Sequence, residues 1–158
     1  MVVTGADQPL GRAVVAALLA AGAAEVRATV RDRSTVRALM ERGVRTAVTD
    51  LVDPLRFGAV IEGAHTVIHL DGVEPVRSWD LLLDAAEGTG VRRLVTVCAP
   101  VADLPPAASG YQVVVVLTAF PASDPGPGAE PPPDLVRALV EADSRRQAGG
   151  LEVVDVRS

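Results

Sequence analysis

Two glycines near the start of the chain have the spacing of a loop that holds phosphate groups. Gly5 and Gly11 flank the stretch ADQPL, between a short apolar segment and a run with helical periodicity. In such loops the glycines allow a tight bend and a close backbone approach, and the amides at the helix start face the phosphates. Gln8 occupies the middle position, where glycine is usual. Its side chain crowds the approach of a phosphate group, although its side-chain amide can donate a hydrogen bond to a phosphate oxygen. We expect a pyrophosphate to bind here; the alternative is a strand-to-helix turn without a ligand.

The basic residues and the cysteine restrict the chemistry further. All 15 basic residues are arginine, and the chain contains no lysine. A mechanism that needs a lysine ammonium, as a proton donor or for a Schiff base, is therefore excluded. The single cysteine, Cys98, rules out an internal disulfide and a cysteine-built metal site. We expect Cys98 to be a small buried residue, and the alternative is a reactive thiol.

The two histidines fall on one predicted strand. His65 and His69 are four residues apart, so their side chains point to the same face of that strand. His69 and Asp71 have a spacing that could hold a metal ion. We expect instead that His69 lies at the edge of the nucleotide site and that no metal binds.

Composition and charge limit the class of protein. The chain has 158 residues, which suits a single domain over 1–158. Its net charge of −5 argues against nucleic acid or an anionic membrane as a partner. No apolar run reaches the ~18 residues of a membrane span. No basic-then-apolar leader comes before the first strand, so we expect a cytoplasmic protein.

Strand and helix patterns alternate along most of the chain. Apolar runs predict strands over 1–4, 25–30, 44–48, 65–70, 92–98, 111–120 and 151–156, and helical periodicity predicts helices over 9–21, 34–42, 53–62, 78–89 and 134–147. Ser34 and Asp53 are the expected caps of two of these helices. The segment 121–133 is rich in proline and glycine and predicts a loop. Near-continuous apolar strands separated by helices predict an α/β fold, a three-layer doubly wound parallel sheet of the Rossmann type.

Five segments together resemble the short-chain dehydrogenase/reductase superfamily, in its extended and atypical NmrA-like branches. They are the turn VTGADQPLG and residues 26–32, 48–72, 81–100 and 149–158. They are similar to that family's TGAxGxxG turn, its second strand, its aspartate–leucine turn with the fourth strand, its fifth strand, and the strand before the substrate-binding portion. The resemblance implies an NAD(P)-binding Rossmann domain, of the kind found in NAD-dependent epimerases and dehydratases.

The resemblance also implies how a dinucleotide would be held. The phosphates would lie on the opening turn, at Thr4, Gly5, Ala6, Gln8, Pro9, Leu10 and Gly11. Arg31 stands about 20 residues after Gly11, where an acidic residue would bind the ribose of NAD and an arginine suits the extra phosphate of NADP. Arg33 could assist. We therefore expect NADP rather than NAD if a cofactor is bound; the alternative is that these arginines are solvated at a strand end.

Further contacts are implied at two later turns. Asp50 and Leu51 would contact the adenine ring, although Asp50 could equally be a turn-capping residue. Leu70, Asp71 and Gly72 follow the fourth strand and would lie beside the nicotinamide ribose. Asp71 replaces a small residue of the family, so it would either hydrogen-bond a ribose hydroxyl or repel the cofactor.

The catalytic pair of the family is missing. Its active members use Tyr-x-x-x-Lys on the helix before the final strand, where the tyrosine transfers a proton. Those positions fall near Leu135 and Leu139, which cannot transfer a proton. The only tyrosine, Tyr111, is followed four residues later by Val115. The family's substrate lobe lies beyond the final strand, so we expect this chain to cover the cofactor half alone.

Three functions remain open. The first is an NAD(P)-binding module without the usual catalytic pair, acting as a dinucleotide sensor, a regulatory subunit or the cofactor half of an enzyme. The second is an active oxidoreductase or epimerase/dehydratase with unrecognised catalytic residues. The third is an interaction domain that has lost the nucleotide, with the strand at Val113–Leu117 as an exposed edge for dimerisation. The expected partners are accordingly a dinucleotide, and a second copy or another protein chain.

Overall fold

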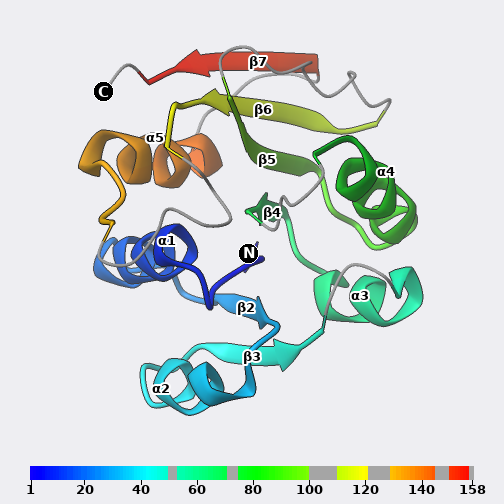
Figure 1. Cartoon of the computed structure of the whole chain (residues 1–158). Helices are drawn as coiled ribbons and strands as arrows, with labels where there is room; N and C mark the ends of the chain where they lie inside the picture. The colour runs from blue at the N-terminus through cyan, green and yellow to red at the C-terminus, as the bar shows by residue number, and fades with distance from the viewer. Residues whose placement is uncertain (50–52, 71–74, 100–109, 121–128, 145–149, 157–158) are drawn as a thin grey trace.

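The computed structural model describes residues 1–49, 53–70, 75–99, 110–120, 129–144 and 150–156 (Figure 1). One seven-stranded sheet runs through them, in the order β3-β2-β1-β4-β5-β6-β7, and every neighbouring pair is parallel. The strands are β1 (Val2–Val3), β2 (Arg27–Val30), β3 (Arg45–Val48), β4 (Thr66–His69), β5 (Arg93–Cys98), β6 (Gln112–Leu117) and β7 (Gly150–Asp155). The predicted doubly wound parallel sheet is confirmed.

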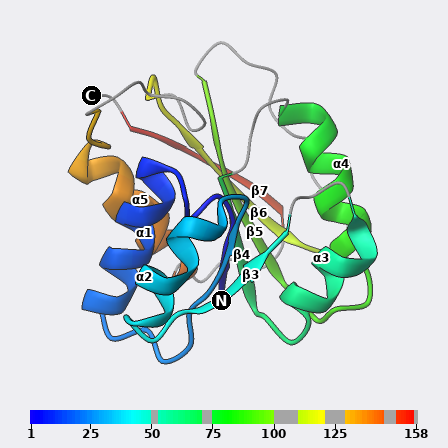
Figure 2. The same ribbon diagram turned by 60° about the horizontal axis from the view of Figure 1, so that its bottom comes forward.

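Helices cover both faces of this sheet. They are α1 (Pro9–Ala20), α2 (Val36–Met40), α3 (Pro54–Ile61), α4 (Pro75–Ala86) and α5 (Pro133–Ser144). Figure 2 shows α1, α2 and α5 on one face and α3 and α4 on the other. In the described part of the chain, no helix is both long enough and apolar enough to cross a membrane.

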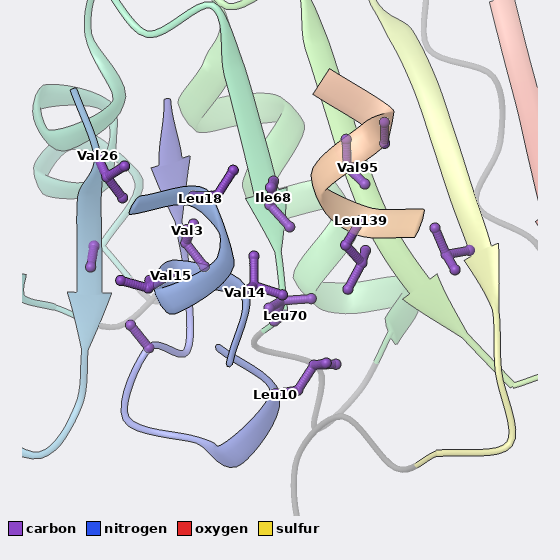
Figure 3. Packing of buried hydrophobic residues seen from close by; sticks show 14 of the residues in the cluster. Val3, Leu10, Val14, Val15, Leu18, Val26, Ile68, Leu70, Val95 and Leu139 are labelled. Carbon is purple, nitrogen blue, oxygen red and sulfur yellow. The ribbon is translucent and has the colours of Figure 1, made fainter. Parts of the chain in front are cut away.

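Each face of the sheet has its own apolar core, built mainly from valine, leucine and alanine. Val14 and Leu18 of α1 and Leu139 of α5 pack over Ile68 and Val95 of the central strands (Figure 3). The second core, under α3 and α4, contains the buried rings of Phe57 and Trp79. Successive residues of a strand point to opposite faces, which is why buried strands flanked by helices are apolar throughout.

Two helix starts follow local capping chemistry, one as predicted and one not. The carboxylate of Asp53 accepts the amide of Arg56 at 3.1 Å and Pro54 follows it, as the sequence predicts for α3. Ser34 was the expected cap of the second helix, and that prediction is wrong. The carboxylate of Asp32 accepts the amide of Ser34 at 2.8 Å instead, and a 3₁₀ turn, η1 (Arg33–Thr35), comes before α2. Both caps rest on the ability of a short carboxylate to accept nearby amides.

The apolar strand β6 is not an edge. It pairs with β5 on one side and β7 on the other, and Val113–Val116 are buried. The prediction that Val113–Leu117 forms an exposed edge for dimerisation is therefore wrong. The reason is that an unbroken apolar run fits an interior strand covered on both faces. The edge positions of this sheet belong to β3 and β7.

A polar cluster ties the start of three strands to the end of α5. The side chain of Arg93 is 6% exposed and donates from Nε to Oε1 of Gln112 at 2.8 Å. Its Nη1 donates to the main-chain carbonyl of Asp143 in the last turn of α5. The Asp143 carboxylate accepts from the Thr66 hydroxyl at 2.5 Å. The side chain of Asp143 is therefore half-buried against β4 rather than on the solvated face of the helix.

Candidate functional site

The carboxyl ends of all the strands meet at one edge of the sheet, because the strands are parallel. The chain leaves β1 and turns toward β2 and β3 on one side, whereas β4 begins the other half of the sheet on the opposite side. In open α/β sheets this reversal point, here at the carboxyl ends of β1 and β4, is where the crevice that binds ligands is formed. The loop after β1 and residues Arg31, Thr49 and Leu70 all follow strands that end at this edge.

The two glycines of the opening turn both have a structural requirement. Gly5 has φ of 64°, a conformation that favours glycine. A Cβ on Gly11 would lie 2.2 Å from the carbonyl oxygen of Gly5, so the turn and the first helix can come this close only with glycine there. The amide of Gln8 donates a hydrogen bond to the carbonyl oxygen of Gly5 at 2.9 Å, which closes the turn. The amide of Ala6 donates to the carbonyl oxygen of Thr29 at 3.0 Å, which joins the turn to β2.

The start of α1 faces this turn without a side-chain cap. Gln8 is the N-cap residue, with extended backbone angles, and its side chain makes no capping hydrogen bond. Pro9 has no N–H, so the first amides that the helix itself leaves unused are those of Leu10 and Gly11. The first turn contains no acidic residue. These amides and the positive end of the helix dipole form an arrangement that attracts an anion.

Several residues predicted for the phosphate site contribute backbone and not side chains. The side chains of Ala6 and Leu10 are buried in the core under α1. Thr4 is also buried; its Oγ1 accepts the amide of Leu70 at 2.9 Å and lies 3.1 Å from Nδ1 of His69. The hydroxyl of Thr4 thus joins the end of β1 to the end of β4, directly beneath the crevice.

His69 is enclosed at the end of β4. It is 3% exposed, and burial lowers the pKa of its imidazole to about 4, so the ring is neutral at pH 7. Nδ1 of the ring lies 3.1 Å from the Thr4 hydroxyl, and the tautomer of the ring decides which of the two groups donates. Nε2 is buried and has no hydrogen-bond partner. His69 is thus a buried, neutral ring in the polar layer at the end of β4.

Asp7 is a residue of this site that the sequence interpretation missed. Its Oδ2 accepts two main-chain amides at the end of β2, from Arg31 at 3.0 Å and from Asp32 at 3.1 Å. Arg12 donates to the Asp7 carbonyl at 2.5 Å. The other carboxylate oxygen, Oδ1, is buried and has no hydrogen-bond partner. The sequence did contain an indication of this role, because Asp7 lies inside the glycine turn and short carboxylates in turns often accept hydrogen bonds from main-chain amides.

A cleft with three arginines lies beside this end of β2. It has a volume of about 320 Å³ and is lined by Arg31, Arg33, Val48, Thr49, Asp53 and Arg56. Two of its arginines come from the turn after β2 and the third from the first turn of α3. Arg31 and Arg33, predicted from the sequence to receive a phosphate, therefore line one cavity, and Arg56 is an addition from the tertiary structure.

Four predicted contacts lie outside the described residues. They are Asp50 and Leu51, expected at the adenine, and Asp71 and Gly72, expected at the nicotinamide ribose. Thr49 and Asp53, on either side of the first pair, both line the arginine cleft.

The side chains that the sequence analysis considered for proton transfer are all shielded from solvent to some degree. Leu135 and Leu139 are fully buried in the core between α5 and the sheet. Tyr111 comes just before β6 and so lies at the amino ends of the strands, the edge opposite the opening turn; burial, with Glu87 nearby, raises the pKa of its phenol. Cys98 ends β5 at the crevice edge but is 6% exposed, and burial raises the pKa of its thiol.

Comparison with known proteins agrees with this geometry. A family model described as NAD(P)H-binding matches residues 5–148. No curated protein matches the chain significantly.

Solved structures share the fold at low sequence identity. MoeE5 in complex with UDP-glucuronic acid and NAD is 21% identical over 98% of this chain and 75% of its own, with a TM-score of 0.69. A nucleoside-diphosphate-sugar epimerase from Staphylococcus aureus is 16% identical over 73% of this chain and 49% of its own, with a TM-score of 0.63. An NADPH-dependent quinone oxidoreductase from Escherichia coli is 21% identical over 72% and 45%, with a TM-score of 0.57. This chain thus spans less than half the length of the last two.

Proposed function

The chain belongs to the NAD(P)H-binding family, and we propose that it binds a dinucleotide without turning it over, as a sensor, a regulatory subunit or the cofactor half of an enzyme. The family match confirms the resemblance to extended and atypical short-chain dehydrogenases/reductases, and the epimerase and reductase structures share its fold. The reactions of those epimerases and reductases belong to those proteins and are not assigned to this chain. The proposal for this chain rests on its own residues.

The observation that carries the proposal is the uncapped start of α1 at the crevice. The Gly5–Gly11 turn brings backbone close to this helix end, and the helix supplies amides and dipole without an acidic side chain. A pyrophosphate placed there would accept hydrogen bonds from the first-turn amides. Gln8 stands at the lip of the turn, half-exposed, where its side-chain amide can donate to a phosphate oxygen.

The arginine cleft supports NADP as the preferred dinucleotide. Arg31 and Arg33 follow β2, next to where a dinucleotide in this fold places the adenosine ribose. Guanidinium groups bind phosphate with two parallel hydrogen bonds, and no lysine is present to replace them. The 2′-phosphate of NADP has the charge and geometry that this cleft accommodates.

Binding without turnover is proposed because the proton-transfer residues are missing. The family resemblance implies positions for the catalytic tyrosine and lysine near Leu135 and Leu139, and the single tyrosine is at the other edge of the sheet. The competing function is an active oxidoreductase. It is favoured by the quinone oxidoreductase among the structural neighbours, and it would require donors other than the family's pair.

Calorimetric titration of the purified chain with NADPH and NADH tests the proposal. We expect both to bind, and Arg31→Gln to weaken NADPH at least tenfold more than NADH, because one charge-assisted phosphate contact is worth roughly 1.5–3 kcal/mol. Arg37→Gln is the matched control, since Arg37 is exposed on α2 and pairs with Glu41 away from the cleft. If neither dinucleotide binds, the proposed function is wrong. If Arg31→Gln weakens NADPH and NADH equally, Arg31 does not bind the 2′-phosphate.

Turnover separates the binding module from the enzyme. NADPH oxidation is followed spectrophotometrically with a panel of quinones, aldehydes and ketones. The proposal expects no substrate-dependent oxidation by the wild-type chain. Oxidation that persists in Tyr111→Phe and in Cys98→Ala would establish an active oxidoreductase with other donors.

A further inference from the structure

We propose that Asp7 is a positioning residue that limits the preference for NADP over NAD, by occupying the main-chain amides at the end of β2 with a negative charge. This inference rests on the proposed dinucleotide function and adds a selectivity residue to it. Its basis is the contact between the opening turn and the turn after β2, two segments 24 residues apart in the chain.

The geometry defines what Asp7 holds. One carboxylate oxygen accepts from two consecutive amides, those of Arg31 and Asp32, at 3.0 and 3.1 Å. Arg31 and Asp32 begin the turn after β2, and the side chains of Arg31 and Arg33 from this turn line the cleft. Asp7 therefore fixes the backbone from which both arginines project, and it takes two donors that an incoming anion would otherwise find there.

The carboxylate of Asp7 is only partly exposed, and one of its oxygens is shielded from solvent. Its second oxygen, Oδ1, is buried and receives no hydrogen bond. A charge in such surroundings acts on its neighbours more strongly than one in bulk water. A 2′-phosphate bound by Arg31 would come to the same end of β2 and would be repelled, whereas the 2′-hydroxyl of NAD carries no charge.

Asp32 is the other carboxylate at this turn, and its side chain is already engaged. Its two oxygens accept from the amide and the hydroxyl of Ser34, at 2.8 and 2.5 Å, and these bonds lower the pKa of the carboxyl. Asp32 is thus held in the 3₁₀ turn as a helix cap. Asp53 lines the arginine cleft, and its carboxylate accepts the amide of Arg56 as the cap of α3. Asp7 belongs to the opening turn, and its carboxylate is the one that contacts the two amides at the end of β2.

The experiment compares two fragments that differ only at the 2′ position. Calorimetry measures binding of 2′,5′-ADP and 5′-AMP to the wild-type chain and to Asp7→Asn. Asparagine retains a carbonyl oxygen for the two amides and removes the charge. We expect 2′,5′-ADP to bind about fivefold more tightly to the variant, with 5′-AMP changed less than twofold, as expected for loss of one partly exposed charge pair. Glu25→Gln removes the same charge at the start of β2 and should leave both affinities unchanged.

The readouts separate selectivity from a merely structural role. Amide hydrogen exchange at Arg31 and Asp32 should stay slow in Asp7→Asn, which shows that the turn is intact. Should that variant unfold, Asp7→Ser, whose hydroxyl can accept one amide, carries the same expectation. Equal changes for the two fragments would overturn the role of Asp7 while leaving the proposed function standing. If the wild-type chain binds neither full dinucleotide, both proposals fail.

Discussion

The hydroxyl of Thr4 lies 3.1 Å from Nδ1 of His69 and so joins β1 to β4 at the point where the order of the sheet reverses. The same hydroxyl oxygen accepts the Leu70 amide. The crevice that parallel sheets use for ligands thus has a buried, hydrogen-bonded floor. A neutral imidazole is part of this floor, and its protonation state couples stability to pH.

His69 should make the protein acid-sensitive. Burial lowers its pKa to about 4 from an ordinary 6.5. The unfolded chain therefore takes up a proton below pH 6.5 that the folded chain does not take up until about pH 4. The free energy of unfolding should fall across this window, by roughly 3 kcal/mol in total from this group. Urea denaturation at a series of pH values measures this loss.

A pair of histidine variants isolates that effect from the carboxylates. His69→Gln keeps a polar side chain beside Thr4 and removes the titration, so its stability should fall less than that of the wild type between pH 6.5 and 4. His65→Gln, at the exposed residue before the same strand, is the matched control. Identical pH profiles for His69→Gln and the wild type would contradict the assignment.

Gly11 should tolerate no side chain. The Cβ of an alanine would lie 2.2 Å from the Gly5 carbonyl oxygen and 2.8 Å from Cα of Ala6, both main-chain atoms. We expect Gly11→Ala to lower the free energy of unfolding by roughly 3 kcal/mol or more and to abolish dinucleotide binding. Gly43→Ala is the control: Gly43 has φ of 82° but open space around it, so a loss of about 1 kcal/mol with binding retained is expected. Guanidinium denaturation and calorimetry distinguish the two.

Arg93 should stabilise the fold far more than its neighbour Arg92. Replacing Arg93 by glutamine leaves the Asp143 carbonyl and the Gln112 side chain without their buried donor, at a cost of about 2–4 kcal/mol. Arg92 is exposed, and Arg92→Gln should change stability by no more than about 0.5 kcal/mol. Thermal unfolding of the two variants provides the comparison. Equal losses would mean that the buried cluster contributes nothing specific.

The thiol of Cys98 should react slowly. It is 6% exposed and its pKa is raised by burial, so little thiolate is present at neutral pH. We expect labelling by a thiol-specific disulfide reagent to be at least tenfold slower in the native protein than in 6 M urea, from the thiolate requirement and burial together. Rapid labelling of the native protein would instead identify Cys98 as a reactive residue.

Local sequence determined the elements and several of their ends. The alternation of apolar strands with amphipathic helices was enough to predict a doubly wound parallel sheet. Strands that are apolar on both faces must be covered on both faces, and helices between parallel strands supply that cover. Asp53 with Pro54 predicted the start of α3, and Gly5 with Gly11 predicted the turn after β1. These features depend on residues within one turn of each other, so they can be read without knowing the fold.

The tertiary structure alone decided how distant side chains are used. Asp7 reaches amides 24 and 25 residues away, and Asp143 bonds Thr66 across 77 residues. The tertiary structure also decided the neighbours of β6, because its pairing with β5 and with β7 involves segments that the sequence does not connect by any local pattern. Hydrogen bonds between segments distant in sequence leave no periodicity, and only the folded chain brings their partners together.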